Sequence, residues 1–138
     1  MHRIATLAVT VVLAACVSSH PIQPQLATSV DFGSAEEERV ELANFDFTPR
    51  EIHLRAGRPY KLILTNLVAG EHDFSAPEFF AAALIKPADA PLVAEGEVDV
   101  PGHATRTVHL VPAAGTYKLV CTHTGHAVLG MTGRIVVD

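Results

Sequence analysis

The segment that most constrains how this chain can fold lies near its C-terminus and reads Cys121-Thr122-His123-Thr124-Gly125-His126-Ala127-Val128-Leu129-Gly130-Met131. It places a thiol, two imidazoles and a thioether within a few residues of one another. Strand-forming residues precede it at 117–120 and follow it at 133–137. Gly125 and Gly130 allow the intervening segment to bend tightly. We therefore expect a loop between two strands that carries all of these side chains.

This combination of side chains predicts a metal site. Sulfur and imidazole ligands together suit copper in both of its oxidation states, and two His with one Cys and a weak axial Met is a known arrangement for electron transfer. The loop supplies Cys121, His126 and Met131 in the spacing Cys-x4-His-x4-Met. The remaining ligand must come from elsewhere, and His72, at the start of a predicted strand, is the best candidate. We predict that these four residues hold one copper ion.

Each predicted ligand also has an ordinary structural alternative. Cys121 and Met131 could be core side chains, and His72 could be a buried, hydrogen-bonded histidine. His123 is too close to Cys121 for both side chains to reach one ion while a strand runs into Cys121, so we expect it beside the ligands or at the surface. We expect the remaining histidines to be solvated or structural: His20, His53, His103 and His109.

The first residues predict export. An almost wholly apolar stretch, 4–15, follows Arg3 and is too short to span a membrane as a mature helix. It ends in Leu13-Ala14-Ala15-Cys16, which resembles the lipobox of bacterial lipoproteins. This resemblance implies cleavage before Cys16, lipid on that residue, and a protein held by lipid on the periplasmic side of a bacterial membrane. An ordinary signal peptide with an incidental Cys is the alternative. If Cys16 carries lipid, Cys121 has no disulfide partner.

Composition divides the chain into three parts: a leader over 1–15, Cys16 with a flexible tether over 16–38, and one domain over 39–138. The tether is rich in Ser, Pro, Gln and acidic residues, and we expect Glu36-Glu37-Glu38 to be its solvated end.

The domain has short apolar runs separated by turn residues, which predicts an all-β sandwich of about eight strands. These are expected near 40–47, 51–55, 60–66, 72–75, 96–100, 105–111, 116–121 and 133–137. The first changes phase, which predicts a bulge with Phe45 and Phe47 pointing inward. Only residues 76–85 favour a helix, with Ser75 as a possible cap and Pro77 near its start. An irregular, Pro-rich stretch is expected at 86–95.

Over nearly all of residues 39–138 the chain resembles the cupredoxins, small blue-copper proteins with a Greek-key β-sandwich. The residues that carry the resemblance are Phe45-x-Phe47-x-Pro49, Ala56-Gly57, Leu64-Thr65-Asn66, Glu71-His72-Asp73-Phe74, Gly115-Thr116-Tyr117, Cys121-x4-His126-x4-Met131 and Gly133-x-Ile135-x-Val137. The resemblance implies a mononuclear type 1 copper centre and one-electron transfer. Many cupredoxins have Asn where this chain has Asp73. A carboxylate there would favour oxidised copper.

Charge and length narrow the possible functions. The formal net charge is −5, and loss of Arg3 with the leader would make it more negative, which argues against nucleic acid as a partner. A monomeric electron carrier is the leading hypothesis. Its redox partner protein would dock on apolar residues around His126, namely Ala127, Val128 and Leu129 with Leu67 and Val68, unless these pack under the loop. Copper delivery to an acceptor protein is the alternative. We do not expect an enzyme, because copper nitrite reductases and multicopper oxidases need further copper sites and domains.

Overall fold

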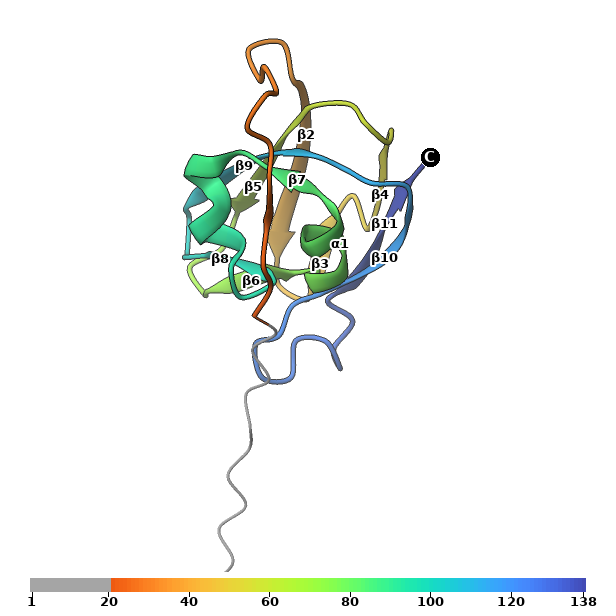
Figure 1. Cartoon of the computed structure of the whole chain (residues 1–138). Helices are drawn as coiled ribbons and strands as arrows, with labels where there is room; N and C mark the ends of the chain where they lie inside the picture. The colour runs from red at the N-terminus through yellow and green to blue at the C-terminus, as the bar shows by residue number, and fades with distance from the viewer. Residues whose placement is uncertain (1–20) are drawn as a thin grey trace, which may run out of the picture.

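The computed structural model describes residues 21–138, so the predicted leader and Cys16 lie outside the described residues (Figure 1). The chain forms two β-sheets that pack face to face, with one short α-helix, which confirms the predicted all-β sandwich. One sheet has the strand order β1-β7-β9-β5-β2-β3 and the other β4-β11-β10-β6-β8. The strands are β1 (Gln25–Leu26), β2 (Glu36–Ala43), β3 (Asp46–Thr48), β4 (Glu51–Leu54), β5 (Tyr60–Asn66), β6 (His72–Ser75), β7 (Leu84–Ile85), β8 (Glu97–Val100), β9 (Thr105–Val111), β10 (Gly115–Val120) and β11 (Thr132–Val137).

The core lies between the sheets because alternate residues of each strand point into it. In β5, for example, Tyr60, Leu62 and Leu64 are buried while the residues between them are half-buried. One core cluster joins residues of both sheets and includes Cys121 and Met131. The alternation that predicted the strands is therefore also what forms the core.

The predicted strand over 40–47 divides in two. β2 and β3 pair as an antiparallel hairpin, and the chain reverses at Asn44-Phe45. Phe45 has a left-handed backbone (φ 63°) and is 37% exposed, so its predicted inward orientation is wrong, whereas Phe47 is buried as expected. The phase change marked a reversal of direction and not a bulge.

The expected flexible tether is also wrong for the described residues 21–38. β1 pairs in parallel with β7, and the Ala27 N–H donates to the Ile85 carbonyl (2.8 Å). Phe32 is buried in a small cluster with Ala27 and Val111. The acidic run begins β2, in which Glu36 pairs with Tyr60 across the ladder. The segment is fixed because β1 pairs with the edge of β7 and because Ala27 and Phe32 pack against Val111 at the end of β9.

The helical region is shorter than expected. Helix α1 covers only Pro77–Ala82, and Ala76 precedes it without a side-chain cap, so Ser75 is not a cap. The last two residues of the predicted helix form strand β7 instead, and the predicted irregular stretch contains the 3₁₀ helix η1 (Pro87–Val93). Phe79 and Phe80 anchor α1 in the core. Within residues 21–138, no helix has the length and apolar character needed to cross a bilayer.

Candidate metal centre

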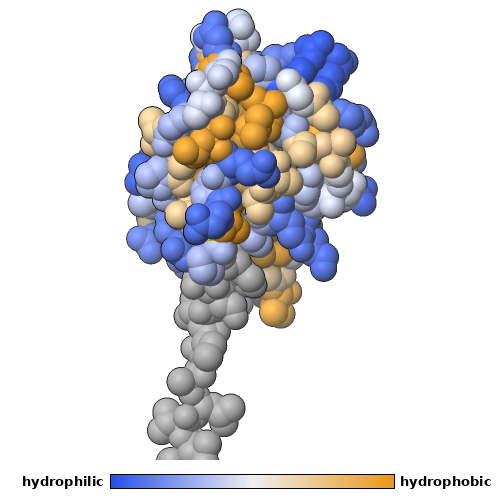
Figure 2. All heavy atoms as spheres, viewed as in Figure 1, coloured by the Kyte–Doolittle hydropathy of each residue, from blue (hydrophilic) through white to orange (hydrophobic). Residues whose placement is uncertain are grey.

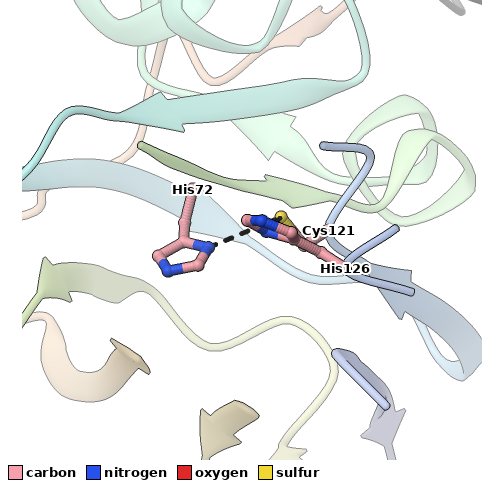
Figure 3. A group of neighbouring side chains, drawn as sticks. All are labelled: His72, Cys121 and His126. Atoms are coloured by element: carbon pink, nitrogen blue, oxygen red, sulfur yellow. Dashed lines mark hydrogen bonds between the residues drawn. The ribbon is translucent and has the colours of Figure 1, made fainter. Parts of the chain in front are cut away.

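Three of the four predicted ligands converge on one point (Figure 3). His72 begins β6, Cys121 directly follows β10, and His126 lies on the loop between β10 and β11. The Cys121 Sγ lies 3.4 Å from the His126 Nδ1 and 3.7 Å from the His72 Nδ1. One donor atom from each residue lies within 4.8 Å of the other two.

These distances fit a first-row metal ion. Bonds of about 2.0–2.3 Å from three ligands in a trigonal plane place neighbouring donor atoms about 3.5–4.0 Å apart. The separations of Sγ from both Nδ1 atoms are close to this range. The cluster therefore already has the shape that a soft metal ion with one thiolate and two imidazole ligands requires.

Backbone hydrogen bonds close the ligand loop at Met131. The Cys121 N–H donates to the Met131 carbonyl (3.1 Å), and the Met131 N–H donates to the His126 carbonyl (2.9 Å). Gly125 and Gly130 have φ of 83° and 106°, as a tight loop requires. Met131 is fully buried at the base of the loop. Its role as an axial ligand stays a prediction.

An asparagine whose role the sequence analysis did not identify holds the segment that carries His72. The Asn66 amide donates to the carbonyls of Gly70 (2.7 Å) and Val100 (2.9 Å), and its side-chain oxygen accepts the N–H of Val68 (3.0 Å). These bonds fix the loop between β5 and β6 and connect it to β8. The only available signal was an Asn at the end of a strand before a Gly-containing loop.

Asp73 joins the two ligand segments. Its buried carboxylate accepts the N–H of Thr122 (2.9 and 3.0 Å) and the Thr122 hydroxyl (2.8 Å). Its Oδ2 atom also lies 3.7 Å from the Cys121 Sγ. A negative charge is thus placed directly beside the sulfur ligand, at the position where the sequence departs from the cupredoxin pattern.

Burial sets the protonation of the ligands. It lowers the pKa of His72, and the neighbouring His126 and His123 lower it further, which favours the neutral imidazole that binds metal. Burial raises the pKa of the Cys121 thiol. A metal ion must therefore displace the thiol proton when it binds. Burial, followed by the charges of Asp73 and Asp99, also raises the pKa of Glu97 beside the site.

His126 is the ligand nearest the surface: it is half-buried, whereas His72 and Cys121 are buried. The Phe45 ring packs edge-on against its imidazole, with ring centroids 5.3 Å apart. Sequence reasoning missed this contact because it placed Phe45 in the core. A phenylalanine at a strand reversal near the ligand loop was the available signal.

The other described histidines do not join the cluster. His123 lies outside it, as expected, with its Nε2 3.7 Å from the Asp73 Oδ2. His53 is exposed and bonds to Glu51, and His109 bonds to Asp89. His103 occupies a turn. His20 lies outside the described residues.

Comparison with known proteins identifies the family and the fold of this chain. The family model described as "Cupredoxin-like domain" matches residues 4–137. Among solved structures, auracyanin B is similar over 88% of this chain and 99% of its own, with 18% identity and a TM-score of 0.59. Sodium-dithionite-reduced auracyanin from the photosynthetic bacterium Roseiflexus castenholzii is similar over 77% of this chain and 99% of its own, with 17% identity and a TM-score of 0.57.

The same fold also occurs within a larger protein. The McoA multicopper oxidase from the hyperthermophile Aquifex aeolicus is similar over 80% of this chain but only 31% of its own, with 15% identity and a TM-score of 0.61. No curated protein matches the chain. At these identities the structural matches establish the fold, and the family model establishes the family. The chain belongs to the cupredoxin-like family, and the cofactor of its His-Cys-His cluster is a single copper ion.

Proposed function

We propose that this protein carries single electrons on the periplasmic side of a bacterial membrane and is not an enzyme. The observation that carries the proposal is the ligand cluster itself. Two of its three members, His72 and Cys121, are buried. The three donor atoms are held by separate elements: His72 by strand β6, Cys121 by the end of β10, and His126 by the loop that follows. A bound copper ion supplies the one-electron Cu(I)/Cu(II) couple. Ligands held in place by the fold move little when the charge of the site changes, which favours rapid electron exchange.

His126 provides the route for electrons to leave the site. The loop that carries His126 exposes Val128 (93%) and Leu129 (62%), and the exposed Phe45 (37%) packs against the His126 ring; we call these three residues the apolar tip. Leu67 is also exposed (49%) and follows β5. The alternative in which Val128 and Leu129 pack under the loop does not agree with this exposure. Transient redox complexes use small interfaces, and an exposed apolar group around one ligand is suited to such a contact.

The protein without its leader, residues 17–138, tests the copper centre. We expect one copper ion per chain, an intense visible band from thiolate-to-copper charge transfer, and an electron paramagnetic resonance signal of copper(II). Cys121→Ser should abolish the band and greatly weaken copper binding. A fully copper-loaded but colourless protein would contradict the proposed centre.

Copper delivery is the competing function, since it would use the same ligands. Reversible reduction and oxidation without loss of the metal is expected of a carrier of electrons. Transfer of copper to a chelator of moderate affinity within minutes would instead favour delivery. We expect the burial of His72 and Cys121 to make that transfer slow.

A further inference from the structure

The described chain enters the domain at the copper end. The Ile22 N–H donates to the Ala94 carbonyl (2.8 Å), and Ile22 packs against the core. Ala94 leads into Glu97, whose carboxylate lies 3.5 Å from the hydroxyl of Thr122, the residue after Cys121. Figure 1 shows the start of the described chain and the loop between β10 and β11 at the same end of the molecule, with the C-terminus at the opposite end.

The apolar tip projects from this end. Its most exposed members, Val128 and Leu129, lie on the ligand loop. Figure 2 shows a hydrophobic projection at the end of the molecule where the described chain begins. The site through which His126 would exchange electrons therefore faces the same way as the N-terminal attachment of the domain.

Chain length limits how far this end can lie from a lipid anchor. Five residue-to-residue steps connect Cys16 to Pro21, and at most about 3.5 Å per step gives a reach of roughly 18 Å in any conformation. A soluble globular domain of about 100 residues has a radius of gyration near 13 Å and so is roughly 30 Å across. Such a protein does not fit between a bilayer and the copper end of the anchored domain.

We propose that the apolar tip faces the membrane and docks on an integral membrane protein whose electron-exchange site lies at the bilayer surface. This inference rests on the lipid anchor at Cys16 assumed in the proposed function. Carboxylates that reach the surface lie beside the ligand site: Glu71 and Asp99 line a hollow next to His72, and Asp99 and Glu97 line the next hollow. Anionic lipid headgroups would repel this acidic rim. A partner protein surface with an apolar centre surrounded by basic residues would be complementary to the apolar tip and the acidic rim.

Orientation can be measured because the chain contains no tryptophan. Single tryptophans are introduced by Val128→Trp at the tip and, as the matched control, by Ala56→Trp near the C-terminal end, where the Ala56 N–H donates to the Asp138 carbonyl. Energy transfer to a dansyl-labelled headgroup is measured in vesicles that carry the reduced, lipidated protein. We expect Val128→Trp to transfer several times more efficiently than Ala56→Trp. Equal transfer from both, or more from Ala56→Trp, would overturn the proposal.

Accessibility gives an independent test. The anchored protein and residues 17–138 are each reduced by a small inorganic complex and by a soluble cytochrome, and the loss of the visible band is followed. We expect similar rates with the small complex but at least tenfold slower reduction of the anchored protein by the cytochrome. A 20-residue Gly/Ser insertion after residue 16, which spans about 25 Å on average, should restore the rate. Equal cytochrome rates without the insertion would contradict a membrane-facing tip.

Mass spectrometry of residue 16 separates the two possible failures. If Cys16 carries no lipid, the anchor fails, and this inference fails with it while the copper chemistry stands. If Cys16 is lipidated but the tip does not approach the headgroups, only the inference about orientation and partner is wrong.

Discussion

Asp73 sets the charge next to the sulfur ligand. Its Oδ2 atom lies 3.7 Å from the Cys121 Sγ, and this charge stabilises the more positive, oxidised site. Asp73→Asn keeps a side-chain oxygen for the Thr122 N–H but removes the charge. A unit charge about 4 Å away contributes about 4 kcal/mol at an effective dielectric constant of 20, so we expect the reduction potential to rise by on the order of 0.1 V.

A spectroelectrochemical titration measures this shift. Asp99→Asn is the matched control, because Asp99 pairs with Asp73 across the β6–β8 ladder but is exposed, so its removal should shift the potential much less. A potential that is unchanged or lower in Asp73→Asn would show that the carboxylate does not act on the site.

Met131 is the predicted axial ligand. Met131→Leu conserves volume, so the cost in stability should be below about 1.5 kcal/mol. If the sulfur is a weak axial ligand, its loss should keep the visible band and raise the reduction potential. Leu110→Met, a similar exchange in a buried residue of β9, should leave the potential unchanged. An unchanged potential in Met131→Leu would make Met131 a core residue only.

The pKa of Cys121 predicts a pH dependence of copper binding. Burial raises this pKa above its usual value, so the copper-free protein carries a protonated thiol at neutral pH. Each copper ion must displace that proton, and affinity should fall up to tenfold for each unit by which pH decreases below the pKa. Calorimetric titration in buffers of different ionisation enthalpy counts the released protons. Cys121→Ser should release one proton fewer.

Among the elements, the segment 21–38 differs most from expectation, because the composition predicted a flexible tether and the structure shows it packed on the domain. Phe32 is buried with Ala27 and Val111, so Phe32→Ala should lower the free energy of unfolding by about 3 kcal/mol, the lower end for a buried phenylalanine. Leu26→Ala is the control, because Leu26 lies on β1 of the same segment but is 49% exposed. Chemical denaturation measures both. Equal, small effects would mean that the segment behaves as the tether the composition predicted.

For the molecule as a whole, the lipid anchor is the feature with the clearest cellular consequence. Cys16→Ala should move the protein from the membrane fraction to the soluble fraction, because no lipid would hold it. Cys121→Ser is the matched control: it should stay with the membrane while losing the visible band. Continued membrane association of Cys16→Ala in cell fractionation would refute lipidation.

The sandwich and the two ligands on one loop could be predicted from the sequence because they depend on local patterns, whereas His72 was predicted from its place at the start of a strand and from the resemblance to cupredoxins. Alternating apolar residues define a strand wherever it pairs, and Cys121 and His126 lie on one short loop. Elements that depend on sparse contacts were predicted less well. β1 and β7 have only two residues each, and they become strands because each finds an edge to pair with.

By itself, the sequence determined which donor atoms are available and which side of each strand points inward, since these are properties of consecutive residues. Tertiary structure alone decided that Asp73 lies against the sulfur, that Phe45 covers His126, and that the N-terminal segment crosses the domain to begin at the copper end. These contacts join residues far apart in the chain. They follow from the order of the strands in each sheet and the way the two sheets pack, which no local pattern specifies.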